Sequence, residues 1–280
     1  MKSLKISLAF LFFSCSQFSF AQSFSLMDRI VNLPEAEEMR VSVTDSISKN
    51  SPAAIVFISS GPDSMNQLFL RELPTLFQIY NPQIGGLGHG NMAFVLHDKD
   101  TFGLTAIHLF GYGSRLKQEI STIGVRQVQD LDMVIVPDTK VVEQFVSKAS
   151  FLDSILLGSL TFITRGLNCW KGDSLITEFF ITGVSEHFAK EDIEFLFKNG
   201  DFTGNKITQT FPRGAYLTKI SKEMWEKMPG MSGCSVTTNL NGKEFFVGLH
   251  TDRMRVLING PQGAFTVYFA VTQPIFESDF

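Results

Sequence analysis

The feature that most constrains the fold is a long succession of short apolar segments, each bounded by Gly, Asn or Asp. These segments are rich in β-branched and aromatic residues, which indicates strands separated by turns. They cover 53–59, 91–98, 102–110, 132–138, 155–166, 175–184, 214–220, 234–240, 243–251 and 265–271. Helical patterning is confined to 64–79, 139–150, part of 187–198 and the C-terminal tail. Because strands do not alternate regularly with helices, we predict two antiparallel barrels or sandwiches rather than a doubly wound parallel sheet.

The N-terminus is typical of an export signal. "MKSLK" supplies positive charge, "ISLAFLFF" is a short apolar centre, and Ser19 and Ala21 precede Gln22 at the two small-residue positions of a cleavage site. The apolar run is shorter than the roughly 18 residues that a membrane helix needs. We therefore expect residues 1–21 to be a signal peptide and the protein to be exported, either to the periplasm or outside the cell.

Composition excludes several classes of protein. The 280-residue chain has a net charge of −4 and no basic block, so we expect no nucleic-acid partner. The five histidines show no zinc-site spacing and no phosphate-binding loop opens a helix, so we expect no metal and no cofactor. After signal cleavage two cysteines remain, Cys169 and Cys234, and the sequence leaves their pairing and the oligomeric state open.

A serine lies on a glycine-rich bend in "PGMSGCSV", residues 229–236. Gly230 and Gly233 around Ser232 allow a tight turn that exposes backbone N–H groups. A serine nucleophile needs such groups to stabilise the oxyanion, a base to accept its proton, and a third group to orient that base. Taken alone, the segment is equally well explained as an ordinary turn.

Two further segments precede this serine in a fixed order. "LTAIH" ends at His108, and "DLDMVIV" contains Asp130 and Asp132 before an aliphatic run. With these motifs the sequence resembles the chymotrypsin-like serine peptidases, and among them bacterial glutamyl endopeptidases. The resemblance implies two six-stranded antiparallel β-barrels, a few short helices and a C-terminal helix. It also implies a triad of Ser232, His108 and Asp132, with Asp130 as the alternative acid, and an oxyanion hole formed by Gly230 and Ser232.

The resemblance covers roughly residues 50–280 and suggests the domain boundaries. We expect an N-terminal extension at 22–50, a first barrel with linker at 51–150, and a second barrel at 151–280. The sequence does not decide whether this extension forms a helix, a pro-segment or a docking arm. Two departures from the family stand out: Asn91 lies where a large apolar residue is common, and Met231 replaces the acid used in zymogen activation.

The segment "VGLHT" suggests a substrate pocket, because some of the peptidases that this sequence resembles have a histidine at this place that faces the specificity pocket. We expect His250 and Lys227 to favour Glu, with Asp or Gln as alternatives, and Thr251 to hydrogen-bond the triad acid. The simpler interpretation is a packed core histidine and a solvated lysine. A peptide or protein substrate is expected to add as a strand along 245–251. The predicted function is that of an exported serine endopeptidase, and the alternative is an inactive binding or scaffold protein with the same fold.

Overall fold

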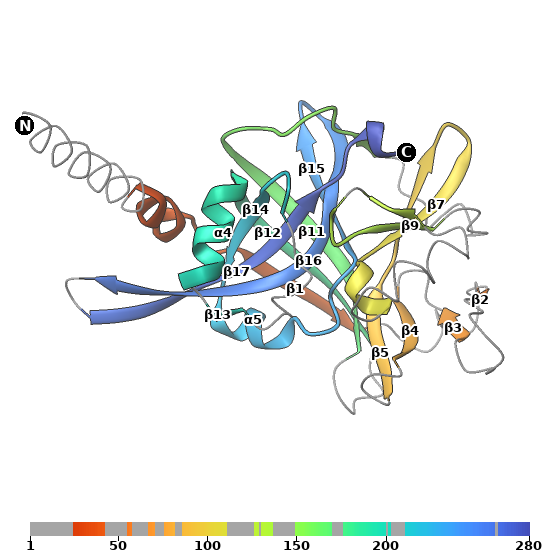
Figure 1. Cartoon of the computed structure of the whole chain (residues 1–280), viewed down its shortest axis with the longest axis horizontal. Helices are drawn as coiled ribbons and strands as arrows, with labels where there is room; N and C mark the ends of the chain where they lie inside the picture. The colour runs from red at the N-terminus through yellow and green to blue at the C-terminus, as the bar shows by residue number, and fades with distance from the viewer. Residues whose placement is uncertain are drawn as a thin grey trace, which may run out of the picture.

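The computed structural model describes residues 25–42, 55–57, 67–70, 76–81, 86–110, 126–128, 130–136, 149–169, 176–199, 201–202, 211–260 and 263–280. Most of this part of the chain forms antiparallel β-strands, and helices are few and short (Figure 1). The predicted all-β fold is therefore confirmed. The predicted signal peptide, residues 1–21, lies outside the described residues. No helix in the described segments is long and apolar enough to cross a bilayer.

The second half of the chain forms a closed barrel. Its strands follow the order β12-β11-β15-β16-β17-β14, and β14 pairs back onto β12 to complete the ring. A sheet that closes on itself leaves no unpaired strand edge, so these strands form one closed barrel of six strands. The strands are β11 (Ser159–Cys169), β12 (Ile176–Phe188), β14 (Ala215–Ile220), β15 (Cys234–Leu240), β16 (Lys243–Gly260) and β17 (Gly263–Pro274).

The first half contributes two four-stranded sheets in its described segments. One follows the order β2-β3-β4-β5 and the other the order β6-β7-β9-β8. The first comprises β2 (Ile55–Phe57), β3 (Gln67–Leu70), β4 (Leu76–Asn81) and β5 (Gly86–Asn91). The second comprises β6 (Ala93–His97), β7 (Asp100–Thr105), β8 (Arg126–Gln127) and β9 (Val134–Val136).

The helix predicted over 64–79 is wrong where the chain is described. Residues 67–70 and 76–81 are β3 and β4, which pair with each other and, through β4, with β5. Pro74, between these segments in the sequence, has no N–H to donate to a helix, and strand pairing satisfies the backbone of β3 and β4 instead.

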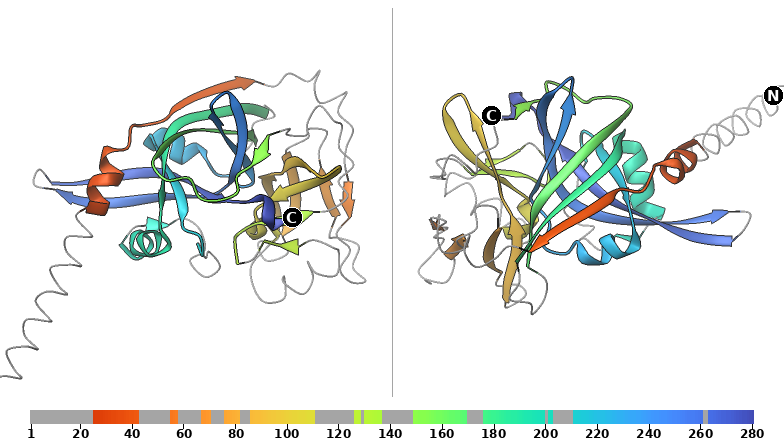
Figure 2. Two further views of the ribbon diagram at one scale, coloured as in Figure 1. Left: turned by 90° about the horizontal axis from the view of Figure 1, so that it is seen from above. Right: turned by 180° about the vertical axis from the view of Figure 1, so that it is seen from behind.

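Residues 25–42 pack as an arm against the second barrel (Figure 2). Residues 25–32 are helical and bury Leu26 and Ile30 in the same core cluster as residues of α4 and β17. The arm continues as β1 (Glu37–Ser42), which pairs antiparallel with β12. Residues 25–42 of the predicted extension are therefore an integral part of the barrel's sheet and core.

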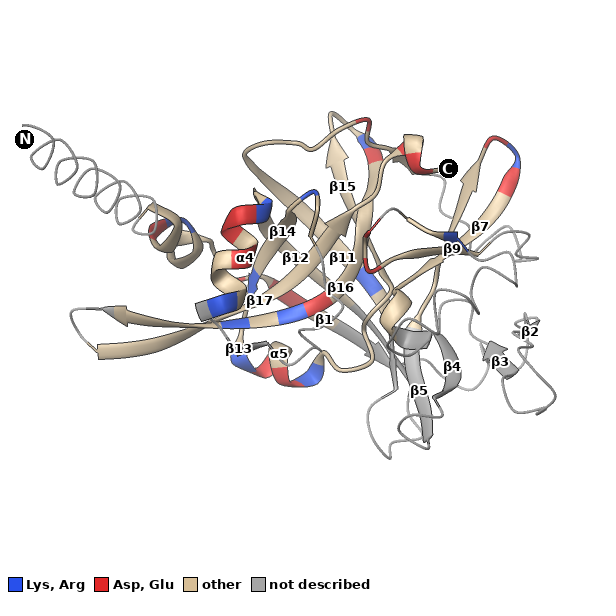
Figure 3. Cartoon of the chain, viewed as in Figure 1, with Lys and Arg blue, Asp and Glu red and all other residues tan. Residues whose placement is uncertain are grey.

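Short helices and strands surround the barrel. Helix α4 (Lys190–Asn199) falls where helical patterning was expected, and α5 (Lys222–Lys227) is capped at its start by Ser221, whose hydroxyl accepts from the Met224 N–H at 3.0 Å. The charged residues of α5 (Figure 3) form two ion pairs one turn apart, Lys222 with Glu226 and Glu223 with Lys227. Two-residue strands flank β16 in addition: β10 (Ser150–Phe151) and β13 (Asp201–Phe202).

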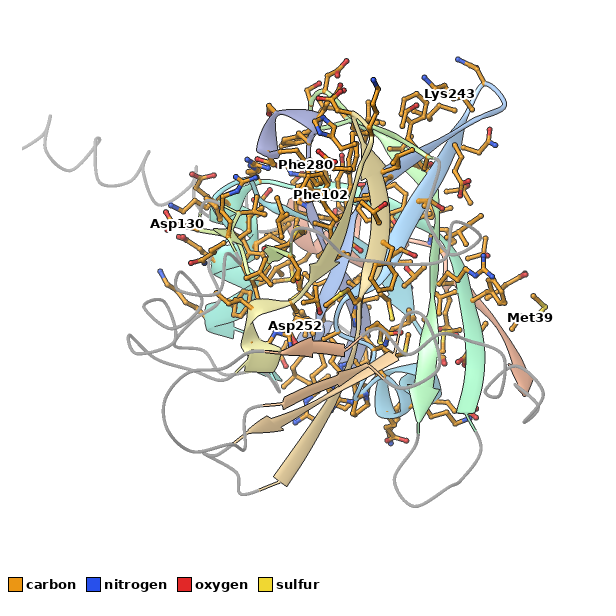
Figure 4. All side chains as sticks on the ribbon, turned by 90° about the vertical axis from the view of Figure 1, so that its right-hand side faces the viewer. Met39, Phe102, Asp130, Lys243, Asp252 and Phe280 are labelled. Atoms are coloured by element: carbon orange, nitrogen blue, oxygen red, sulfur yellow. The ribbon has the colours of Figure 1, made fainter. Side chains whose placement is uncertain are left out.

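The two halves share a core beside the end of the chain. One buried cluster joins Leu104 and Ile135 of the first half to Phe246 and Leu249 of β16. The last residue, Phe280, lies against Phe102 with ring centroids 5.4 Å apart (Figure 4). The expected C-terminal helix is limited to a 3₁₀ turn, η3 (Glu277–Asp279), since the chain there folds back onto the first half.

Candidate active site

The structure joins His108 and Asp132 through two hydrogen bonds. His108 lies in the 3₁₀ turn η1 (Ile107–Phe110) after β7, and Asp132 lies just before β9, which pairs with β7. The His108 ring Nδ1 is 2.5 Å from Asp132 Oδ2, and the His108 backbone N–H donates to Asp132 Oδ1 at 2.9 Å. Because both carboxylate oxygens are engaged, the imidazole has a fixed position relative to the acid.

The electrostatics of this pair favour a basic imidazole. Burial alone lowers the pKa of His108, but the charge of Asp132, its hydrogen bond to the ring and the charge of Asp252 outweigh burial and raise the pKa above the ordinary 6.5. The side chain of Asp132 is only 2% exposed, whereas that of His108 remains 15% exposed. A carboxylate at Nδ1 holds the proton there and leaves Nε2 with the lone pair of a base.

A residue of the second barrel holds the acid in place. The side-chain oxygen of Gln273, in β17, accepts the backbone N–H of Asp132 at 3.0 Å, and Gln273 is fully buried. Asp130, the alternative acid, is exposed on the outside of the molecule, where Figure 4 labels it. Of the two candidate acids, the one in contact with the His108 ring is therefore Asp132.

Ser232 lies in a compact turn between α5 and β15. Gly230 has φ 95° and Gly233 has φ 88°, both in the region that disfavours side chains. Met231, where trypsin-like zymogens carry an acid, is fully buried in an apolar cluster with Trp225. Within the described chain, the backbone N–H groups of Gly230 and Ser232 make no hydrogen bond. Unsatisfied N–H groups in such a turn can stabilise an oxyanion.

A chain of hydrogen bonds through Asn91 connects this turn to the strand that precedes His108. The Ser232 carbonyl accepts the Asn91 N–H at 2.8 Å, and the Asn91 carbonyl accepts the hydroxyl of Thr105, the last residue of β7, at 2.6 Å. The N–H of Gly233 donates to the His250 carbonyl at 2.8 Å. The hydroxyl of Ser232 makes no hydrogen bond to any described residue, so the nucleophile–base contact is not closed in this conformation.

His250 is buried beside a β-bulge. The register of β16 against β17 shifts between His250 and Asp252, which leaves Thr251 as the extra residue. Successive strand residues normally point to opposite faces, but His250, Thr251 and Asp252 are all buried here, as expected where a bulge re-aims side chains. Burial, followed by the charge of His108, lowers the pKa of His250 to about 3, so its imidazole is neutral.

Lys227 and Thr251 were also expected to contribute to substrate binding. The Lys227 ammonium pairs with Glu223 one turn earlier in α5. The Thr251 hydroxyl is buried and has no hydrogen-bond partner in the described part of the chain, so it does not bond the triad acid. The structure thus brings together His108 and Asp132 and does not show the expected Thr251 bond, while the role of Lys227 toward substrate stays a prediction.

The predicted docking strand, 245–251, is wrong for most of its length. Phe245 and Phe246 pair with both β15 and β10, and Gly248 to His250 pair with both β15 and β17. A peptide cannot add to a strand whose two sides are already occupied. The described pairing of β15 ends opposite His250 and that of β13 begins at Met254, so an added strand would have to lie between these points.

Sequence reasoning missed two residues that support the His108–Asp132 pair. Gln273 and Asp252 carry no recognisable motif, because Gln273 acts through a hydrogen bond and Asp252 through its charge, each on a residue more than 100 positions away. Cys234 is a free, buried thiol, so the Cys169–Cys234 disulfide that the sequence left open is not formed. Burial raises the pKa of the Cys234 thiol, which makes it a poor nucleophile.

The described chain thus combines an antiparallel all-β fold, a closed six-stranded barrel, a hydrogen-bonded His108–Asp132 pair and a Gly-x-Ser-Gly turn. No protein-family model and no curated protein matches the chain. Among solved structures, it is similar to catalytically inactive tobacco etch virus protease complexed with substrate, at 14% identity and TM-score 0.38, over 73% of this chain and 81% of that one. It is also similar to catalytically active tobacco etch virus protease complexed with product, at 15% identity and TM-score 0.36, over 78% and 80% of the two chains.

Proposed function

We propose that the protein is an exported serine endopeptidase. The observation that carries this proposal is the double hydrogen bond between His108 and Asp132, which fixes the tautomer and orientation of the imidazole. An imidazole held in this way at Nδ1 is a general base at Nε2. Export rests on the N-terminal sequence pattern alone.

In the proposed mechanism, Ser232 Oγ attacks the carbonyl carbon of the scissile peptide bond while His108 Nε2 accepts the hydroxyl proton. The N–H groups of Gly230 and Ser232 stabilise the oxyanion. His108 then protonates the leaving amine, the C–N bond breaks and an acyl-enzyme forms on Ser232. Water, deprotonated by His108, releases the acid product and restores the hydroxyl.

The proposed mechanism requires the Ser232 hydroxyl to reach His108 Nε2 when substrate binds. Catalytic hydrogen bonds are often long or misaligned without substrate and tighten in the Michaelis complex. A binding or scaffold protein with the same fold is the second candidate, and the observation in its favour is that the Ser232 hydroxyl makes no hydrogen bond in the described chain.

For specificity we propose that His250 donates a hydrogen bond to a side-chain oxygen of the substrate. Its Nδ1 is buried without a hydrogen-bond partner among the described residues, whereas buried polar atoms ordinarily have one. A neutral ring suits the amide oxygen of Gln and the carboxylate of Glu alike. Arg253, further along β16 with its guanidinium 4.0 Å from the centre of the Trp225 ring, adds positive charge that favours Glu.

A fluorophosphonate probe tests the reaction class. We expect the probe to label wild-type protein at Ser232 and to leave Ser232→Ala and His108→Ala unlabelled. Correctly folded wild-type protein that stays unlabelled and cleaves no peptide would favour the binding protein. A peptide library tests specificity: cleavage after Glu or Gln supports the role of His250, and cleavage after Arg or Phe without that preference rejects it.

A further inference from the structure

Asn91 makes a contact with the nucleophile turn that the proposed mechanism does not use. Its side-chain Nδ2 donates to the Gly230 carbonyl at 3.0 Å, and its backbone N–H donates to the Ser232 carbonyl at 2.8 Å. These two carbonyls belong to the residues whose N–H groups are proposed to form the oxyanion hole. One residue of the first half therefore holds both ends of that three-residue turn.

The position of the Asn91 side chain is fixed from several directions. Asn91 is fully buried at the end of β5, and its carbonyl accepts the Thr105 hydroxyl at 2.6 Å. A Cβ on Gly166 would lie 2.9 Å from Asn91 Oδ1, and a Cβ on Gly233 would lie 1.9 Å from the Asn91 carbonyl oxygen. The two glycines thus allow β5, β11 and the turn to approach closely around this side chain.

The orientation of a peptide group links these contacts to catalysis. A carbonyl and the N–H of the next residue point in opposite directions across one planar peptide unit. The Gly230 carbonyl shares its peptide unit with the Met231 N–H, and the Ser232 carbonyl shares its unit with the Gly233 N–H. Holding both carbonyls toward Asn91 therefore fixes the two peptide units on either side of the unit that carries the Ser232 N–H, which restricts rotation of that N–H. Catalysis by an oxyanion hole depends on donors that are already aimed before the reaction begins.

We propose that Asn91 is a positioning residue, which acts through Gly230 and Ser232 to hold the oxyanion-hole N–H groups in their productive orientation. This inference rests on the proposed peptidase function for its catalytic consequence. Its structural content, that the side-chain amide of Asn91 orders the 230–232 turn, stands independently of that function. Large apolar side chains, which the resemblance leads one to expect at this position, have no such donor.

The test compares two Asn91 variants with a matched control. Asn91→Ala removes the donor, and Asn91→Asp keeps the shape but places a second acceptor opposite the Gly230 carbonyl. Thr238→Val is the control, because it removes a similar bond in β15, from the buried Thr238 hydroxyl to the Thr161 carbonyl at 2.8 Å, away from the turn. Hydrolysis of a peptide that wild type cleaves, and hydrogen–deuterium exchange of a fragment spanning 229–234, are measured for all variants.

We expect both Asn91 variants to lose about 10- to 100-fold in kcat, part of the loss seen when an oxyanion donor is removed altogether, with KM changed less than about threefold. The 229–234 amides, which include the bonded N–H groups of Met231 and Gly233, should exchange about tenfold faster or more. Thr238→Val should keep kcat and the exchange rate near those of wild type, even if its melting temperature falls as much as that of the Asn91 variants.

The outcomes separate this inference from the proposed function. Unchanged exchange in the Asn91 variants, or the same increase in Thr238→Val, overturns the role of Asn91. Faster exchange in protein that cleaves no peptide rejects the peptidase and retains the ordering role. A loss of kcat without faster exchange also overturns the inference, because the effect would then not pass through the turn. If Asn91→Ala does not fold, Asn91→Asp decides by the same two measurements.

Discussion

Asp132 hydrogen-bonds His108 at two points, the ring Nδ1 and the backbone N–H. Together the two bonds fix the orientation of the imidazole. The acid in turn is anchored by Gln273, from the closed barrel of the second half, through the Asp132 N–H. The geometry of the proposed base therefore depends on both halves of the molecule, and the charge of Asp132 can be separated from its shape by substitution.

Asp132→Asn should preserve the backbone contact and abolish the charge. An amide NH₂ facing the ring favours the wrong tautomer, so kcat should fall by roughly 10⁴-fold while KM changes little. NMR titration of the His108 ring should show a pKa below the wild-type value, since the main groups that raise it are lost. Asp130→Asn is the control, because its side chain is exposed, and a larger loss in that variant would assign the acid to Asp130 instead.

Activity should depend on pH through His108. The proposed base must be neutral, and its raised pKa means that it is protonated up to a pH above 6.5. We therefore expect kcat/KM to be low in acid and to rise through a midpoint above 6.5. Burial keeps His250 neutral, with a pKa of about 3, so it should contribute no step in this range. A rising limb centred below pH 6 would contradict this assignment.

The ion pair between Arg213 and Asp279 should matter for stability. The two terminal guanidinium nitrogens donate to the carboxylate, at 2.7 and 2.6 Å, and the Asp279 side chain is only 2% exposed. Arg213→Ala leaves a buried charge uncompensated and should lower the free energy of unfolding by about 3–5 kcal/mol. Lys222→Ala, which breaks an exposed pair with Glu226, should cost less than about 1 kcal/mol. Urea denaturation of both variants measures the difference.

Gly166→Ala should destabilise the contact between β11 and the nucleophile turn. The new Cβ would lie 2.2 Å from Cys234 Sγ, and overpacking of this kind costs about 1–3 kcal/mol. Adding Cys234→Ala removes the clashing sulfur and should recover part of the lost melting temperature. A double variant no more stable than Gly166→Ala would show that the sulfur is not the obstacle.

Ile30→Ala tests whether the N-terminal arm is part of the folded unit. Ile30 is fully buried against the barrel, so the truncation should cost about 2–5 kcal/mol. Asn32→Ala, an exposed position in the same helix, should change stability by less than about 0.5 kcal/mol. Equal, small effects in both variants would show that the arm detaches without cost.

The strand pattern predicted the fold class well because period-2 alternation and turn residues are local signals. β15 at Cys234–Leu240 has the predicted bounds, and β14 and β17 lie close to theirs. The 64–79 segment failed because short apolar runs fit either period, and pairing partners decide between them. β1 was missed because its place in the sheet depends on β12, which lies more than 130 residues away.

Residue types and their order pointed to His108, Asp132 and Ser232. The choice between Asp130 and Asp132, however, concerns which carboxylate reaches the ring, and only the turn before β9 determines that. The bulge at Thr251 could not be predicted either, because register is a relation between two strands. Asn91 was noted as unusual from sequence, but its role depends on the approach of β5 to the turn.

The pairing of β1 with β12 should hold the N-terminal arm in place even after the chain is cut behind it. Six residue pairs join these strands, and the helix before β1 adds buried apolar contacts. A single cut between residues 42 and 55 would leave the arm attached without a covalent bond. A separately made peptide spanning the arm should then reassociate with the truncated remainder, as in fragment complementation.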